Sequence, residues 1–439
     1  MKNFAAVLSF LAVFFAATAT SRAKEVVIVT SFPKELFETY KKAFEAKNPG
    51  IKVTINSKPT PAGVTYIRET RAKPEADIFW VSSPDAFQTL KTDGLLDKYQ
   101  PPREITAKIP AKIGTFPIHD PDGTFFGFAV SGYGLMWNRN YLQAHRLQPP
   151  KEWTDLANAK YHGHLVISAP SRSGTTHITI EVILQAYGWD KGWALLLEAG
   201  GNMGAVTERS FGVPEAVISG QYGIGIVIDF FGLSAIASGH PVDFAYPSLT
   251  SIVPANVAII KSAPNLENAR AFVNYLLSEP GQMVLFSPEI GRLPVIPDLY
   301  AKGPKNYPNP FTMKLGGVEF NNRLSSGRRD VVNSLYDHII TFRHRELKDA
   351  WGAIYRAEEA ITKGKGQDLS QARSLVAEAR KLAAQVPIND KRASDKEVTG
   401  AFKAKSGLRA QLETEWERFA TAHYAKAREL ANKASSLAR

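Results

Sequence analysis

Short β-branched runs alternate with helix-type apolar spacing along the first 300 residues, and this alternation limits the folds open to the chain. The run EVVIVTS is followed by a segment in which Leu36, Tyr40 and Phe44 recur at helical spacing. Asn48-Pro49-Gly50 then predicts the end of that helix. Strands and helices that alternate in this way predict parallel sheets covered by helices on both faces.

Two long extended runs, 125–138 and 242–261, flank a middle block of alternating elements. This layout suits a chain that crosses to a second domain and then returns. We therefore expect one α/β lobe from residues 24–130 and 248–300, and a second lobe from 131–247.

The character of the sequence changes beyond residue 300, where apolar residues recur at spacings of three and four. This spacing predicts an α-helical extension over 301–439, whose helices pack on each other or on the lobes, or present a surface to a partner. Three stripes carry the pattern: Val332-Leu335-Ile339-Phe342, Leu375-Ala379-Leu382-Val386, and Leu408-Leu412-Trp416-Phe419-His423-Ala427-Leu430.

Residues 1–23 have the layout of a cleavable secretory signal peptide, with a lysine, an apolar run and small residues ending at Ala23. The apolar run is too short for a membrane anchor. The chain has no cysteine, which excludes disulfides, thiolate metal sites and a lipid-modified amino-terminal cysteine. Most of the net charge of +11 lies after Arg328, and an exported protein is not expected to bind nucleic acid. We expect a periplasmic protein.

A hydroxyl-rich turn, APSRSGTTH, follows the β-type run HLVIS and precedes an apolar helix pattern. Gly174 permits close approach of a ligand to the backbone. The amino-terminal end of the helix favours an anion, although Ser173 or Thr175 could also act only as a helix cap. A nucleotide-binding loop is not expected because no G-K-[ST] ending is present. The hydroxyl donors are Ser171, Ser173, Thr175 and Thr176.

Other predicted strands also end in polar or aromatic residues. Ligands of open α/β sheets bind outside the carboxyl ends of strands, so these residues are expected to meet in one cleft. Carboxylates there could accept hydrogen bonds from ligand hydroxyls or an amine, and an arginine could pair with an anion. The additional candidates are Ser31, Phe32, Ser82, Ser83, Arg172, Glu208 and Asp229.

Motifs for catalysis are absent from the sequence. There is neither a G-x-S-x-G elbow nor an H-E-x-x-H pair. His162 and His164 would flank a strand start and face opposite ways, so we expect no metal site there. We expect neither an enzyme nor a bound cofactor.

Residues 24–300 resemble the family 1 extracellular solute-binding proteins, the periplasmic receptors of ATP-binding-cassette importers. The resemblance implies a type 2 periplasmic-binding-protein fold, with two α/β lobes joined by crossing hinge strands and closing on a solute. It also implies a permease in the inner membrane as a partner, and we expect a monomer. The matching stretches are DIFWVSSPDAFQTLKTDGLL, GYGLMWNRNYL, EWTDLANAKYHGHLVISAPSRSGTTH, VPEAVISGQYGIGIVID and ENARAFVNYLLSEPGQMVL.

Within the family the chain is similar to the branch that includes ferric-ion receptors. Those receptors carry adjacent tyrosines where this chain has Phe230-Phe231, and phenylalanine cannot bind Fe³⁺. The Ser/Thr turn is similar to that of relatives that bind sugar phosphates, phosphoglycerate or phosphonates. The resemblance therefore implies a small anionic solute, with Glu208 and Asp229 at its non-phosphate end, and leaves ferric ion as an alternative. The extension resembles that of phosphoglycerate-regulatory receptors, so signalling to a membrane sensor kinase is a further alternative.

Overall fold

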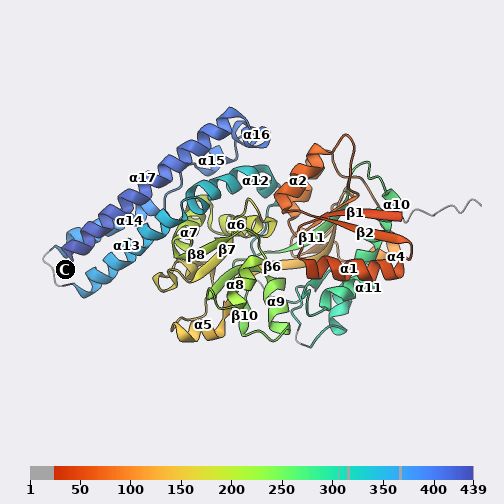
Figure 1. Ribbon diagram of the computed structural model, residues 1–439, viewed down its shortest axis with the longest axis horizontal. Coiled ribbons are helices and arrows are strands. Elements are labelled where there is room, and N and C mark those ends of the chain that lie inside the picture. Colours follow the sequence, from red (N-terminus) through yellow and green to blue (C-terminus); the bar gives the residue numbers. More distant parts are fainter. Residues whose placement is uncertain (1–23, 306, 314–316, 365–367, 439) are drawn as a thin grey trace, which may run out of the picture.

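The computed structural model describes residues 24–305, 307–313, 317–364 and 368–438. The predicted signal peptide, residues 1–23, lies outside the described residues. Figure 1 shows two α/β lobes side by side and a rod of helices that projects beyond one of them. Within the described ranges, every helix is too short or too polar to span a bilayer.

Lobe 1, as we call the half that holds the first strand, is built on a mixed sheet of order β2-β1-β3-β11-β6. β1 runs parallel to β2 and β3, whereas β11 is antiparallel to β3 and β6. The apolar residues Leu36, Tyr40 and Phe44 are buried on α1, which confirms the predicted helix and its inner face. The strands are β1 (Lys24–Thr30), β2 (Ile51–Ser57), β3 (Ile78–Val81), β11 (Ile252–Ile259), β12 (Leu293–Pro294) and the first half of β6 (Phe126–Asn138), and the helices are α1 (Lys34–Lys47), α2 (Thr60–Glu69), α3 (Pro84–Thr92), α4 (Arg103–Thr106), α10 (Leu266–Leu277) and α11 (Glu279–Met283).

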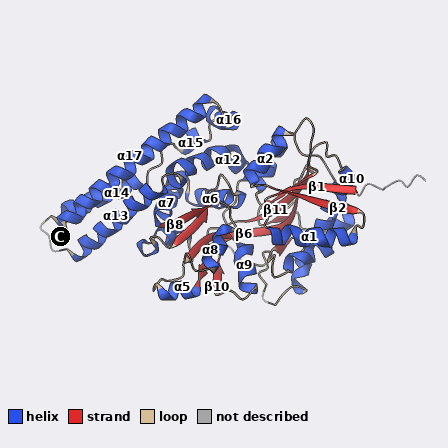
Figure 2. Cartoon of the chain, in the orientation of Figure 1, coloured by secondary structure: helices blue, strands red, loops and turns tan. Residues whose placement is uncertain are grey.

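Lobe 2, the other half, has a sheet in which β9 lies between β6 and β7, and β7 pairs in parallel with β8. Strands form the centre of each lobe and helices lie outside them (Figure 2). The strands are β7 (Leu165–Ser168), β8 (Met203–Thr207), β9 (Ile224–Ile228) and β10 (Val242–Ala245), and the helices are α5 (Arg139–Ala144), α6 (Gly174–Tyr187), α7 (Trp189–Asn202), α8 (Gly212–Ile218) and α9 (Asp229–Ala237). A separate short hairpin, β4 (Lys112–Ile113) and β5 (Phe116–Pro117), lies outside both sheets.

One strand, β6, belongs to both lobes. Its residues up to Gly132 pair with β11 of lobe 1, and its residues from Tyr133 pair with β9 of lobe 2. The chain returns between β10, which pairs with the end of β6, and β11. Two α/β lobes joined by crossing strands, with helices after them, agree with the predicted fold class; the boundaries near residues 130 and 248 stay a prediction.

The residues after 320 form a helical extension. Figure 1 shows α12 above α6 of lobe 2 with one end beside α2 of lobe 1, followed by a long bundle of α13, α14 and α17. A π-helical turn (Asp337–Thr341) separates α12 from α13. The helices are α12 (Asn322–Tyr336), α13 (His344–Lys363), α14 (Leu369–Ala383), α15 (Asp390–Ala393), α16 (Lys396–Ala404) and α17 (Gly407–Leu437).

The bundle is anchored on lobe 2 by α13. Its Trp351 is buried and lies directly on α7, where a Cβ at Gly201 would approach the Trp351 Cδ1 atom to 2.2 Å. Glycine is therefore needed at that point of α7 for α13 to approach. The sequence-based stripe Val332-Leu335-Ile339-Phe342 is correct for its first three residues, but Phe342 is 51% exposed. The wide π-helical turn shifts the helical register and rotates Phe342 out of the interface.

Candidate functional site

Turns from both lobes meet in one cavity. Lobe 1 contributes the residues after β1 and β3 and the start of α2, and lobe 2 contributes the residues around the start of α6, after β8 and at the start of α9. Seven of the residues predicted from sequence line it: Ser31, Phe32, Ser82, Arg172, Ser173, Gly174 and Thr175. Their contact with a ligand stays a prediction. Sequence reasoning missed Pro33, Thr60, Arg209 and Ser210 as lining residues, whereas Phe230 and Phe231, which it placed at the position of the ferric ligands, also line the cavity.

The turn before α6 is organised by its own hydroxyl groups. The Ser173 side chain accepts a hydrogen bond from the Thr176 amide at 3.1 Å and so caps the helix. Thr176 points inward, where its hydroxyl bonds that of Ser168 at the end of β7. The positive end of the fourteen-residue helix α6 therefore faces the cavity, with Thr175 and Gly174 on its rim.

The charged lining of the cavity is basic. Arg172 and Arg209 both line it, and no carboxylate is among the lining residues in the described part of the chain. Burial lowers the pKa of Arg209, and the neighbouring Glu208 acts in the opposite direction. The Phe211 ring lies 5.0 Å from the Arg209 guanidinium and helps to hold it. Two arginines and a helix amino terminus in one cavity favour an anionic ligand.

The two lobes are closed on each other in this structure. A Cβ at Gly174 would lie 2.7 Å from the Thr60 hydroxyl and from Ser83 Cβ, both in lobe 1. Thr60 also donates to the Ser31 hydroxyl at 2.9 Å. The space left between the lobes is about 10 Å³, enough for about one water molecule. A small-molecule solute can therefore enter only when the lobes part.

Five predicted site residues do not line the cavity in this arrangement. Ser83 is fully buried at the start of α3, where its hydroxyl bonds Asp85, and the Thr176 hydroxyl bonds Ser168. Ser171 lies beside Asp337 of the extension, and Glu208 is exposed next to Arg209. The hydroxyls of Ser83 and Thr176 are thus used by contacts within the protein, although Ser83 itself lies where the two lobes meet.

Asp229 is the fifth of these residues, and it is fully buried. Its carboxylate accepts hydrogen bonds from the Gly132 amide at 2.6 Å, the Phe230 amide at 2.8 Å and the Tyr246 hydroxyl at 2.9 Å. Burial raises its pKa to about 6, and these hydrogen bonds offset only part of that rise. Asp229 thus joins α9 to the crossing strand β6 and presents no carboxylate to the cavity.

Arg292 lies directly behind the cavity wall, and sequence reasoning missed it. It is fully buried, and its Nη2 donates to the Ser82 hydroxyl at 3.2 Å. Burial lowers its pKa to about 10, although Asp229 raises it. A single arginine in the irregular segment before β12 carries no periodic signal that would have identified it.

The extension contacts both lobes beside this cavity. Arg329 of α12 forms an ion pair with Asp85 of α3 in lobe 1, and His177 of α6 in lobe 2 lies 3.0 Å from the same carboxylate. Burial alone would raise the pKa of Asp85, but Arg329 and then His177 overcome burial and hold it well below its ordinary value. Helix α12 is therefore part of the interface between the lobes.

Further contacts fix α12 to lobe 2. His177 Nδ1 lies 2.7 Å from the Asn333 side-chain oxygen, and Arg328 binds Glu181 through two hydrogen bonds of 2.9 Å. The extension explains why α6 carries His177 and Glu181, both fully buried, in an otherwise apolar helix.

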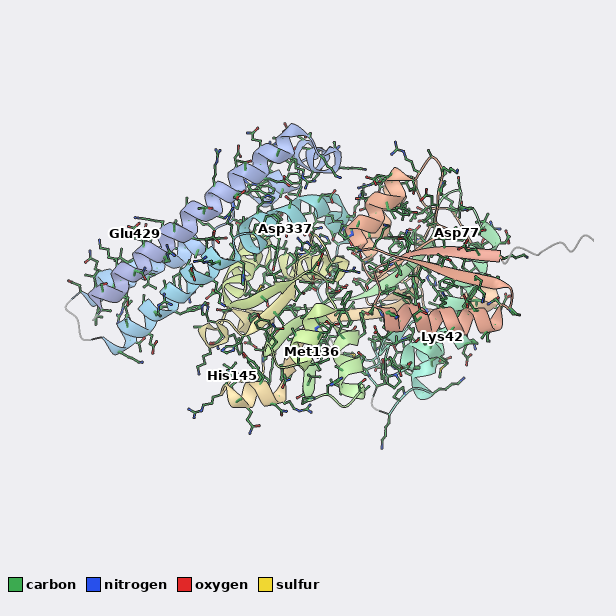
Figure 3. All side chains as sticks on the ribbon, in the orientation of Figure 1. Lys42, Asp77, Met136, His145, Asp337 and Glu429 are labelled. Carbon is green, nitrogen blue, oxygen red and sulfur yellow. The ribbon has the colours of Figure 1, made fainter. Side chains whose placement is uncertain are left out.

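Asp337 links the extension to the predicted anion-binding turn. It lies in the π-helical turn at the end of α12, where Figure 3 labels it. Burial raises the pKa of Asp337, and the Ser171 hydroxyl and the Arg172 charge act against that rise. A group of the extension thus lies beside two residues of the turn, one of which lines the cavity.

A family model described as bacterial extracellular solute-binding protein matches residues 73–320, more than half of the chain. The chain belongs to the bacterial extracellular solute-binding proteins. Members of this family serve as the solute receptors of ATP-binding-cassette importers, which agrees with the predicted family and with the two-lobed fold.

The phosphoglycerate transport regulatory protein PgtC of Salmonella typhimurium is 31% identical over 398 residues, which is 90% of this chain and 93% of that protein. A match of this length must include most of the segment after residue 300. This solute-binding protein therefore shares its carboxyl-terminal segment with PgtC as well as its lobes.

Two solved structures show the same fold. The periplasmic binding protein AfuA of Actinobacillus pleuropneumoniae, with fructose-6-phosphate bound, has a TM-score of 0.65 at 21% identity and covers 72% of this chain and 99% of its own. Iron-bound HitA of Pseudomonas aeruginosa has a TM-score of 0.56 at 18% identity and covers 68% and 94%. The fold is thus shared by proteins that hold chemically opposite ligands, and the lining of the cleft must decide between them.

Proposed function

We propose that this protein is a periplasmic receptor for a small phosphorylated or phosphonate solute, which it passes to a permease of the inner membrane. The observation that carries the proposal is the lining of the interlobe cleft. Arg172 and Arg209 lie there with the hydroxyls of Ser173 and Thr175 and the positive end of α6. A phosphate accepts hydrogen bonds from amides and hydroxyls and is neutralised by guanidinium groups.

Two relatives support the same solute class. AfuA is described with bound fructose-6-phosphate, and PgtC is named for phosphoglycerate transport. Ferric ion fits the cleft less well because Fe³⁺ needs anionic oxygen ligands. The lining side chains in the described part of the chain are hydroxyls, arginines, phenylalanines, a proline and a glycine. Two guanidinium groups in the cleft would repel a trivalent cation.

Solute entry and capture require the lobes to open and close. The solute first meets the α6 turn of lobe 2, and closure then brings Ser31, Thr60 and Ser82 of lobe 1 against it. This is hinge closure of the kind known for periplasmic receptors, with β6 as one of the crossing segments.

Isothermal titration of the mature chain against fructose 6-phosphate, 3-phosphoglycerate, 2-aminoethylphosphonate and ferric citrate tests this proposal. We expect at least one of the phosphorus compounds to bind and its unphosphorylated counterpart not to bind. Binding of iron alone, or equal binding of fructose and fructose 6-phosphate, would refute the proposal.

A second function, sensing of the solute, is favoured by the extension. Helix α12 holds Asp85 of lobe 1 and His177 and Glu181 of lobe 2, so a change in the gap between the lobes must move or strain α12. The π-helical turn then leads into the α13–α14–α17 bundle, which could present that change to a membrane sensor kinase.

Hydrogen–deuterium exchange of the full chain, with and without the solute that titration identifies, tests the sensory role. We expect altered exchange at residues 336–343 and along α13 in addition to the cleft. Changes in exchange confined to the lobes would show that the extension only stabilises the structure and does not respond to the solute. The matched control is the same chain with the unphosphorylated counterpart.

A further inference from the structure

Arg292 is a buried cation with few partners of its own. Its side chain makes one hydrogen bond, from Nη2 to the Ser82 hydroxyl, while Nε and Nη1 have no partner among the described residues. Asp229 is the acidic residue whose charge acts on it, without a hydrogen bond between the two among the described contacts. An unpaired buried charge is costly for a fold, so Arg292 calls for a partner that the described residues do not provide.

Asp229 is the acidic residue that acts on Arg292 most strongly, but its carboxylate is already hydrogen-bonded to other groups. Its oxygens accept hydrogen bonds from Gly132, Phe230 and Tyr246. Aromatic rings give Arg292 part of its stabilisation, with Phe230 at 4.0 Å and Phe32 at 4.5 Å from the guanidinium. Aromatic rings accept N–H hydrogen bonds only weakly, so they do not replace an oxygen acceptor for Nε and Nη1.

The groups that enclose Arg292 are themselves walls of the cleft. Ser82, Phe32 and Phe230 all line the cavity. Ser82 and Phe32 belong to lobe 1, which also holds Arg292 next to β12, whereas Phe230 belongs to α9 of lobe 2. Because Phe230 and Arg292 come from different lobes, parting of the lobes would separate the ring from the guanidinium.

The cleft therefore offers two separate positive regions. One is formed by Arg172, Arg209 and the start of α6 on lobe 2, and the other is Arg292 behind Ser82 on lobe 1. A solute with one phosphate can satisfy only one of them. We infer that Arg292 receives a second anionic group, the carboxylate of a phosphorylated carboxylic acid, and so sets the specificity of the receptor.

A carboxylate suits this position better than a second phosphate. The guanidinium lies over the Phe230 and Phe32 rings, and a planar carboxylate can accept from its Nη1 and Nη2 atoms in the same plane. A tetrahedral phosphate would project out of that plane toward the rings. The inference rests on the proposed phosphate-binding role of the α6 turn and names the other end of the same solute.

The test compares two probes that differ at one carbon. Titration of the full mature chain with 3-phosphoglycerate and with glycerol 3-phosphate separates the carboxylate from the phosphate. We expect 3-phosphoglycerate to bind at least tenfold more tightly. Arg292→Met should reduce the affinity for 3-phosphoglycerate to within about twofold of that for glycerol 3-phosphate, whose own affinity should hardly change.

Two further variants keep the test decisive if Arg292→Met folds poorly. Arg292→Lys retains the charge without the planar pair of donors, and it should keep a smaller preference for 3-phosphoglycerate. Arg103→Met removes an exposed arginine of lobe 1 and should keep the full preference. Thermal melting of each variant measures the fold independently of the two affinities.

The possible failures are distinguishable. If neither phosphate compound binds to the wild-type chain, the proposed function fails together with this inference. If both bind equally well, or if Arg292→Met loses both to the same extent, the phosphate site survives and the role of Arg292 is refuted.

Discussion

The Asp85 carboxylate lies 3.0 Å from Nε2 of His177, and these two fully buried residues come from different lobes. Arg329 of the extension holds the same carboxylate. One carboxylate thus joins lobe 1, lobe 2 and the carboxyl-terminal helices in the closed state. Opening of the cleft must break or stretch these contacts, which makes the junction a direct target for mutation.

Loss of the Asp85 charge should weaken the fold. In Asp85→Asn, Arg329 becomes a buried charge without a compensating anion, and we expect the free energy of unfolding to fall by about 3 to 5 kcal/mol. Urea denaturation at pH 7 measures this change. Asp330→Asn, at an exposed position of α12, is the control and should change stability little. Equal stability of wild type and Asp85→Asn would refute the structural role of the ion pair.

The contribution of Asp85 should also depend on pH. In the unfolded chain the pKa of Asp85 is about 3.9. In the folded protein its pKa is held well below that value. The stabilisation is therefore complete above about pH 4 and is lost as the pH falls toward the folded pKa. Urea denaturation from pH 6 to pH 2.5 should show that the difference in free energy of unfolding between wild type and Asp85→Asn becomes smaller below pH 4. A difference that does not change with pH would contradict a stabilising role of the ion pair.

Asp229 should show the opposite dependence. Its folded pKa is raised to about 6, so its contribution is most favourable below pH 4 and is lost as the pH rises through 6. A shift of about two units corresponds to about 3 kcal/mol. In urea denaturation, the free energy of unfolding of Asp229→Asn should therefore rise relative to that of wild type by about 3 kcal/mol between pH 4 and pH 7. If the difference in free energy of unfolding between wild type and Asp229→Asn did not change with pH, the pKa of Asp229 would be that of an ordinary aspartate.

Adjacent threonines of the α6 turn should respond differently to removal of their hydroxyls. Thr175 lines the cavity, so Thr175→Ala should weaken binding of the phosphorylated solute more than tenfold, about 1.4 kcal/mol, with an unchanged melting temperature. Thr176 bonds the buried Ser168 hydroxyl, so Thr176→Ala should lower stability by about 1 to 3 kcal/mol. Calorimetric titration and thermal melting of both variants test the pair. Unchanged affinity in Thr175→Ala would mean that the turn is only a helix cap.

A methyl group at Gly174 should hold the lobes apart. A Cβ there would lie 2.7 Å from Thr60 and Ser83 across the gap, too close for full closure. We expect Gly174→Ala to remain folded, to bind the solute at least tenfold more weakly and to show a larger radius of gyration in small-angle scattering. Gly400→Ala is the control, because a Cβ at that position of α16 meets no atom within 4 Å. If Gly174→Ala closed fully, with the radius of gyration of wild type, the contact between the lobes at Gly174 would be refuted.

The sequence predicts much of the fold because its signals are local. The spacing of Leu36, Tyr40 and Phe44 requires only one helix face, and the Ser/Thr turn requires only the junction of β7 and α6. The direction of Asp229 depends instead on Gly132 and Tyr246, which are distant in sequence, and no local pattern reports them.

The same reasoning explains the two arginines that the sequence did not reveal. Arg292 is held by Ser82, which is distant in sequence. Arg209 lies just after β8 beside Phe211, but a single charged residue in a turn carries no pattern that marks it as part of the cleft. Apolar spacing alone predicts a buried Phe342, because a π-helical turn cannot be recognised from that spacing.

A crystal structure of the mature chain with bound 3-phosphoglycerate is the most direct measurement. The phosphate should lie at the start of α6, in contact with Ser173 or Thr175 and with at least one of Arg172 and Arg209. A phosphate bound outside the gap between the lobes, or at its opposite end from the α6 turn, would contradict the account.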